Sequence, residues 1–316
     1  MLLKSADTKA ADIEILSNLL AHKNIQDAKK QSISRELHNV TKGAKTENEA
    51  AYLIDFHFGA SKNMMVLHDL RIELNGRVAQ IDHILINRLC EVFVLETKSF
   101  SSGLSINELG EFSTTYDGRK VGIPSPIEQN ERHITVLRDA FKSIGLPKRL
   151  GIAIPPSFHS VILVSQNSVI ERPNSKKQAL ENVIKLDQFI SWYNKRIDKT
   201  SVLDTWEILK VCSGNTVMNL CKKLAALHKP LRIDYVRKFD LVNELTSKVV
   251  PPVVRSEPSK HAFTPTTLAV DRLVEPATHR CMNCQKTIAE VVAQFCWKNK
   301  IRFGGKVFCR TCQGKF

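Results

Sequence analysis

The chain opens on polar sequence in which apolar residues recur at helical spacing. This pattern predicts one or two helices over the first forty residues, packed on the outside of a core. A further helix is predicted from about residue 42, and Gly59 is a plausible end for it. The apolar face of this helix consists of Ala50, Leu53, Ile54 and Phe58.

Strand patterns replace the helical ones after residue 63. Residues 64–74 alternate and are rich in β-branched side chains, and residues 78–87 and 91–100 are two apolar runs joined by a short segment. We expect the last two runs to form a hairpin that is buried on at least one face. Residues 103–123 predict a second hairpin, with its turn at Asp117 and Gly118, which extends the same sheet.

Helical and strand patterns alternate in the rest of the core. A helical stripe after Pro126 ends at Gly145, residues 158–166 form another strand, and residues 183–197 and 201–228 have helical patterns. This order predicts an α/β fold with one mixed sheet and helices on its faces. Five of the twelve prolines lie in residues 250–278, which have little periodicity and therefore indicate a linker.

Length and charge narrow the class of protein. A chain of 316 residues has room for a catalytic domain and one or two smaller units. It contains no run of 18 apolar residues and no secretory leader, so we expect a cytoplasmic protein without membrane contact. The net charge of +14 favours polyanionic partners, because cationic side chains displace the counterions of phosphates.

Charged residues interrupt two of the predicted core strands. Asp82 lies in one apolar run and Glu96 in the next, and burial of such groups is costly unless they are paired or bind a metal. Strand alternation places Glu96 and Lys98 on one face, and an antiparallel neighbour would bring Asp82 to the same place. Two carboxylates and an ammonium suit phosphodiester hydrolysis with Mg²⁺ or Mn²⁺ bound to Asp82 and Glu96.

Two other interpretations of these residues stay open from the pattern alone. The set could be an ion pair that joins two strands, as most loosely spaced carboxylates and lysines are. Glu47, near the start of the preceding helix, could add a metal ligand or could simply favour the helix terminus. Glu49 is the competing candidate for that place.

Residues from about 42 to 154 resemble the nuclease-related domain (NERD), which is grouped with the PD-(D/E)XK nucleases. The resemblance rests on the segments KGAKTENEAAYLI, QIDHILIN, VFVLETKSF and SPIEQNERHITVL. It implies a restriction-endonuclease-like fold with a Mg²⁺-dependent nuclease site. It also implies that this site contains Glu47, Asp82, Glu96, Lys98 and the site-facing Gln129.

Two histidines adjoin these positions. His83 should face away from Asp82 by strand alternation, so we interpret it as a core histidine. His133 lies one helical turn after Gln129 and could contact the site or a phosphate, although a structural role is the simpler interpretation.

Two CxxC pairs near the end of the chain predict a four-cysteine zinc site. The ligands would be Cys281, Cys284, Cys309 and Cys312, and the 24 residues 285–308 separate the pairs. Cys296 could replace one ligand, but we interpret it as a core residue, like Cys90, Cys212 and Cys221. Residues 279–316 carry eight Lys or Arg and one Glu, interleaved with aromatics, which suits nucleic acid.

These patterns divide the chain into five segments. They are a helical extension (1–41), the nuclease-like core (42–198), a helical segment (199–249), the linker (250–278) and a zinc ribbon (279–316). The function they favour is that of a metal-dependent nuclease or other DNA-processing enzyme, with RNA as the other polyanion to consider. The alternative is a catalytically silent adaptor that binds nucleic acid or protein on the same fold.

Overall fold

The computed structural model divides the chain into two compact units, Met1–Val249 and Val250–Phe316, and each is described by itself. The structure describes residues 1–100, 102–149, 151–174, 178–201, 211–246, 279–288, 292–293, 296–297 and 303–313. The predicted linker 250–278 lies outside the described residues. Among the described residues, no helix combines the length and the apolar character that a bilayer span requires.

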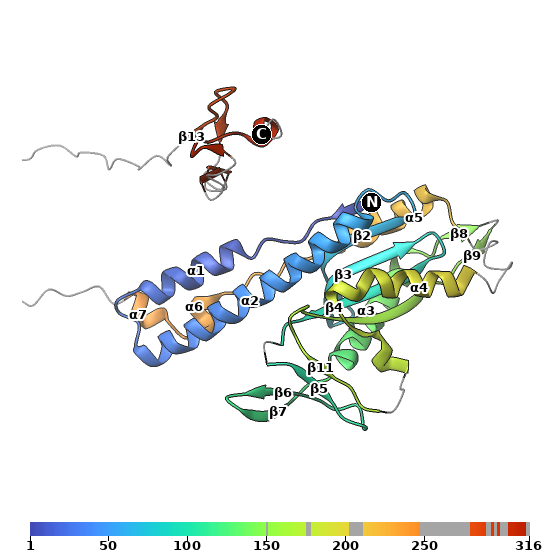
Figure 1. The fold of residues 1–316 in the computed structure, drawn as a ribbon, viewed down its shortest axis with the longest axis horizontal. Coiled ribbons are helices and arrows are strands. Elements are labelled where there is room, and N and C mark those ends of the chain that lie inside the picture. The colour runs from blue at the N-terminus through green and yellow to red at the C-terminus, as the bar shows by residue number, and fades with distance from the viewer. Residues whose placement is uncertain are drawn as a thin grey trace, which may run out of the picture. The chain divides into compact units, whose positions relative to one another are not determined.

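A six-stranded mixed sheet forms the centre of the first unit, in the order β1-β2-β3-β4-β10-β12 (Figure 1). The pairs β2–β3 and β3–β4 are antiparallel, whereas β1–β2, β4–β10 and β10–β12 are parallel. The strands are β1 (Leu2–Lys4), β2 (Met64–Leu74), β3 (Arg77–Asn87), β4 (Glu91–Lys98), β10 (Ser157–Val164) and β12 (Val183–Lys185).

Helices cover both faces of this sheet, as the alternation of helical and strand patterns predicts. On one face, α3 (Pro126–Ile144) and α5 (Gly214–Ala225) pack against Ile84, Ile86 and Val94. On the other face, α2 (Asp27–Phe58) and α4 (Phe189–Ser201) enclose a second core around Phe93. The fold is therefore mixed α/β, with its sheet flanked by helices.

A helical arm forms one side of the first unit. The arm consists of α1 (Ala10–Ala21), the first half of α2, α6 (Tyr235–Lys238) and α7 (Val242–Thr246), which run side by side in Figure 1. Its small core contains Leu16, Ile33, Tyr235 and Leu241. The helix expected from residue 42 is thus the second half of a single 32-residue helix that begins at Asp27 and ends before Gly59.

The second predicted hairpin forms, but it does not extend the main sheet. It belongs to a separate four-stranded sheet, ordered β11-β5-β6-β7. The β6–β7 turn has Asp117 and Gly118 at positive φ, as a tight hairpin requires. The expected extension is wrong because β10 pairs with β4 along its whole length and so occupies that edge. These strands are β5 (Leu104–Ile106), β6 (Phe112–Tyr116), β7 (Arg119–Ile123) and β11 (Ile170–Glu171).

The second unit has a small core of its own. A two-stranded antiparallel sheet of β13 (His279–Arg280) and β14 (Thr287–Ile288) precedes the short helix α10 (Arg310–Gln313). Ile288, Cys296, Phe303 and Phe308 pack together with Cys281, Cys309 and Cys312. Cys296 is fully buried, which agrees with its interpretation as a core residue.

Candidate active site and four-cysteine cluster

Asp82 lies where strands β3 and β4 separate. The β3–β4 ladder stops at the pair His83–Leu95, so Asp82, the neighbour of His83, lies just beyond the ladder. Beyond it, Asp82 Oδ2 accepts hydrogen bonds from the Thr97 backbone N–H at 2.7 Å and from Thr97 Oγ1 at 2.5 Å. The Asp82 carboxylate therefore accepts the Thr97 N–H hydrogen bond in place of a backbone carbonyl of a paired strand. Burial raises the pKa of Asp82, and the two Thr97 hydrogen bonds oppose this rise.

Glu96 and Lys98 share one face of β4, as strand alternation predicts. Lys98 Nζ lies 2.7 Å from Glu96 Oε1, and Gln129 Nε2 donates to the same oxygen at 2.8 Å. Gln129 occupies the first turn of α3, which Ser125 caps and in which Pro126 is the first residue. The structure thus brings Gln129 to the same carboxylate that Lys98 contacts.

The second oxygen of Glu96 faces His133. Glu96 Oε2 lies 3.6 Å from His133 Nδ1, and both atoms are buried without a hydrogen-bond partner among the described residues. Burial, together with the charge of Asp82, raises the pKa of Glu96 to about 8. Burial and the charge of Lys98 lower the pKa of His133 to about 4, so this imidazole is neutral at pH 7. Of the two histidines considered from the sequence, His133 is the one at the site.

The α2 helix brings Glu47 into the electrostatic field of these residues. Burial and then the charge of Asp82 raise the pKa of Glu47 to about 7, and Lys98 acts in the opposite direction. Glu49, by contrast, has a 39% exposed side chain and lies 3.9 Å from Lys45. The geometry therefore favours Glu47 over Glu49 as the α2 carboxylate of the site.

The structure adds Asp69 and Lys9, which the sequence analysis missed. Asp69 falls directly opposite Asp82 in the β2–β3 register, between the pairs His68–His83 and Leu70–Ile81. Lys9 Nζ lies 3.1 Å from Asp69 Oδ2, and Gln80 donates to Oδ1 at 3.3 Å. Asp69 interrupts an apolar run as Asp82 does, which was a usable signal. Lys9 carried no signal, because its position depends on the pairing of the distant strands β1 and β2.

Asp69 also changes the direction in which β2 side chains point. Its φ of 50° is left-handed, a conformation that aspartate tolerates better than most residues. Met65 and Leu67 before it, and Leu70 and Ile72 after it, all face the same core, so the alternation shifts by one residue at Asp69. This irregularity allows polar side chains to gather between two otherwise apolar strands.

The acidic cluster, defined as Glu47, Asp69, Asp82 and Glu96, has two ammonium groups against its four carboxylates. Lys98 contacts Glu96 and Lys9 contacts Asp69. The buried Glu96 oxygen and the raised pKa values of Glu47 and Glu96 show that full ionisation of the cluster is costly. Carboxylates that are costly to ionise on their own suit a hard divalent cation, because its charge would offset that cost.

His83 lies on the other side of the sheet from α3. Its Nδ1 shares a 2.8 Å hydrogen bond with His68 Nδ1, and His68 Nε2 lies 3.1 Å from Asp55 of α2. Burial lowers the pKa of both imidazoles. His83 is therefore a buried, hydrogen-bonded histidine, which agrees with its interpretation from strand alternation.

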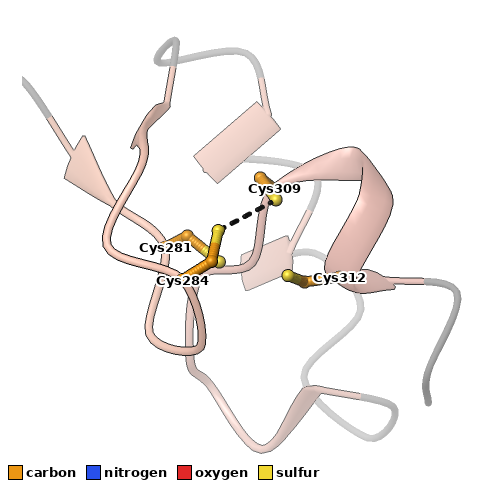
Figure 2. A group of neighbouring side chains, drawn as sticks. All are labelled: Cys281, Cys284, Cys309 and Cys312. Atoms are coloured by element: carbon orange, nitrogen blue, oxygen red, sulfur yellow. Dashed lines mark hydrogen bonds between the residues drawn. The ribbon is translucent and has the colours of Figure 1, made fainter.

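Cys281, Cys284, Cys309 and Cys312 bring their sulfur atoms together in the second unit, within 4.8 Å of one another (Figure 2). Tetrahedral zinc with Zn–S bonds of about 2.3 Å requires sulfur separations slightly below 4 Å, and the Cys284–Cys309 pair is at 3.6 Å. Asn283 Nδ2 approaches Cys312 Sγ at 3.3 Å. The cluster is compatible with structural zinc. In the described parts of the chain, no other group of three or more His, Cys, Asp or Glu side chains lies close enough together to hold a metal ion in this way.

Comparison with known proteins assigns a domain to the first unit. Residues 42–165 match the family described as NERD, the nuclease-related domain. The chain therefore contains a nuclease-related domain, and the match includes Glu47, Asp82, Glu96, Lys98 and Gln129. No curated protein and no solved structure matches the chain significantly.

Proposed function

We propose that this protein hydrolyses phosphodiester bonds of DNA with the help of a divalent cation. The proposal is supported by the 2.7 Å contact of Lys98 with Glu96, by the charge of Asp82 acting on Glu96, and by one buried Glu96 oxygen that lacks a hydrogen-bond partner among the described residues. A binding module gains nothing from carboxylates that are costly to ionise, whereas cation-dependent hydrolysis needs them. RNA has the same phosphodiester linkage, and the cleavage assay below distinguishes the two polymers.

Asp82 and Glu96 would hold Mg²⁺ or Mn²⁺, with Glu47 as a further ligand, directly or through water. Such an ion supplies polarisation of a phosphoryl oxygen and a lowered pKa for its bound water. The fit rests on donor chemistry, since hard cations take oxygen ligands and would lower the cost of ionising Glu47 and Glu96.

The side chains of the protein have separate tasks in this proposal. Thr97 fixes the Asp82 carboxylate through two hydrogen bonds, and Gln129 fixes Glu96. An ammonium group has three N–H donors, so Lys98 can contact Glu96 and still donate to a phosphoryl oxygen on which charge develops.

The second unit would raise the affinity for the substrate. Residues 279–316 contribute eight cationic side chains against one carboxylate, and a tethered cationic module increases the local concentration of the catalytic unit on DNA. Zinc would hold this small module together, since its apolar core is limited.

The test is cleavage of supercoiled DNA, linear DNA, single-stranded DNA and RNA with Mg²⁺ or Mn²⁺. Wild-type protein should cut at least one of them, and Lys98→Ala should lose at least 100-fold in rate, as when one transition-state donor is removed. Lys45→Ala is the matched control, because Lys45 is an exposed lysine paired with Glu49. Cutting by Lys98→Ala at the wild-type rate would refute the assigned site.

A further inference from the structure

A cleft of about 320 Å³ lies between the helical arm and the candidate active site. Glu47, Lys9 and Gln80 are in its wall, and each belongs to the acidic cluster or contacts it. The rest of the wall comes mostly from outside the nuclease-related domain, from Asp12 and Asn39 and from the segment that leads into α6. Parts of this chain that lie outside the nuclease-related domain therefore build much of the cleft.

The cleft combines charged, polar and apolar surfaces, and its charged members are one cation, Lys9, and two carboxylates, Asp12 and Glu47. Lys9, Asn39 and Gln80 supply hydrogen-bond donors. The apolar members of the wall are Val40, Leu231, Ile233 and the ring of Tyr235. Tyr235 is almost fully buried and stacks on Phe239 with ring planes 13° apart, so the aromatic part of the wall is held in place.

We propose that this cleft binds one nucleotide unit of a single-stranded substrate, next to the phosphate that is cut, and that Lys9 contacts the phosphate of that nucleotide. The inference rests on the proposed nuclease function. The apolar side chains of Leu231 and Ile233, backed by the buried ring of Tyr235, suit a base and sugar, and the donors of Lys9, Asn39 and Gln80 suit a phosphate. A volume of about 320 Å³ accommodates one nucleotide and excludes a base pair.

Lys9 is positioned for this contact. It immediately precedes α1, its Nζ lies 3.1 Å from Asp69, and its side chain is 24% exposed and lines the cleft. Glu47 and Asp7 add negative charge around it and stabilise its ammonium form. Because one N–H of an ammonium suffices for Asp69, the others can reach a ligand. Lys9 thus links the arm to the site and gives the cleft its cation.

The structure offers two independent ways to test the cleft. Lys9→Met removes the cation, and Lys29→Met is the matched control. Lys29 is also on the arm, has a 28% exposed side chain and pairs with one carboxylate, Glu244, at 2.6 Å. Lys9→Arg should retain binding, since it keeps the charge.

Gly43 provides the second test. It lines the cleft within α2, and of the surrounding atoms only Glu47 Oε1, at 3.6 Å, lies within 4 Å of a Cβ added there. Gly43→Ala is therefore accommodated, whereas Gly43→Leu projects into the cleft. Both substitutions favour the helix, because glycine costs about 1 kcal/mol relative to alanine inside a helix.

The measurement is fluorescence anisotropy of a 12-nucleotide single strand and of a 12-base-pair blunt hairpin, with full-length zinc-loaded protein and no Mg²⁺. Lys9→Met should weaken single-strand binding about tenfold and reduce the salt slope by about 0.7, as the loss of one phosphate contact requires. Gly43→Leu should weaken it to a similar extent. Gly43→Ala and Lys29→Met should bind like wild type, and hairpin binding should be unchanged in all variants.

Equal single-strand affinity of Lys9→Met and Lys29→Met would overturn the proposal, as would equal losses on the strand and the hairpin. The outcome is separable from the proposed function. If single-strand binding depends on Lys9 but wild type cuts no substrate, nucleotide binding in the cleft stands, and the nuclease proposal fails together with the placement of the cleft beside a cut phosphate. If DNA is cut but Lys9→Met and Gly43→Leu bind the single strand like wild type, only the cleft proposal fails.

Discussion

Two buried glutamates on β4 should respond in opposite ways to the loss of their charge. Glu96 has a pKa raised from 4.5 to about 8, mainly by burial. Glu91, five residues earlier, has a lowered pKa, because His159 lies 3.2 Å from its Oε1 and Asn87 donates to its Oε2 at 2.6 Å. Glu96→Gln should therefore stabilise the protein at alkaline pH, whereas Glu91→Gln should destabilise it.

The magnitude follows from the pKa of Glu96. Between pH 4.5 and 8 the native state binds more protons at Glu96 than the unfolded chain does, so the free energy of unfolding falls as pH rises through this window. The rise in the pKa of Glu96 from 4.5 to about 8 corresponds to a free energy of roughly 5 kcal/mol. Water entry and rearrangement reduce such penalties, and we expect Glu96→Gln to be more stable than wild type by about 2–3 kcal/mol at pH 8.5.

Glu91 supplies the opposite pH dependence. A lowered pKa contributes stability above the unfolded value of 4.5, and this stability is lost as pH falls through the folded pKa. Glu91→Gln should therefore lose stability at both pH 8.5 and pH 5.5, and the loss should shrink only below about pH 4.5.

The assay is urea denaturation of the full-length chain followed by circular dichroism, without Mg²⁺ or Mn²⁺, at pH 5.5 and pH 8.5. The advantage of Glu96→Gln should mostly disappear at pH 5.5, where wild-type Glu96 is protonated. Adding Mn²⁺ should stabilise wild type more than Glu96→Gln. If Glu96→Gln is destabilised at pH 8.5 to the same extent as Glu91→Gln, Glu96 is a structural ion-pair partner of Lys98, and the reasoning fails.

Three further predictions concern the other proposed residues. Purified protein should contain about one zinc per chain by elemental analysis, and Cys281→Ser should lose most of it; full retention would exclude Cys281 as a ligand. Deletion of residues 279–316 should weaken DNA binding and flatten its salt dependence in a titration, and unchanged binding would contradict the tethering role. Glu47→Gln should reduce cleavage at least tenfold while Glu49→Gln cuts normally, and the reverse would reassign the α2 carboxylate.

The main strands and the Asp82–Glu96–Lys98 set were predictable because both depend on short-range periodicity. Charged residues within apolar runs predicted the candidate site, and alternation placed Lys98 beside Glu96, as the 2.7 Å contact confirms. The choice between Glu47 and Glu49 required the structure, because it depends on how α2 is rotated against the sheet. Burial and then the charge of Asp82 raise the pKa of Glu47, and both effects depend on that rotation.

Features that depend on long-range packing were not predictable in the same way. Lys9 reaches Asp69 only because β1 pairs alongside β2 and so brings the segment before α1 next to Asp69, and the left-handed φ of Asp69 shifts the alternation of β2. The second hairpin forms a separate sheet because β10 takes the edge of β4, a competition that local patterns do not record. Such competition for an edge depends on the whole topology.

The central claim is that this cluster of carboxylates and lysine cuts DNA. The most direct measurement is Mg²⁺-dependent cleavage by wild type beside Asp82→Asn, with DNA binding checked for both chains. Asparagine keeps an acceptor for Thr97, so the local fold should survive while the charge is lost. We predict cleavage by wild type alone, with equal DNA binding by both. Equal cleavage by both chains, or DNA binding without cleavage by wild type under any divalent cation, would contradict the account.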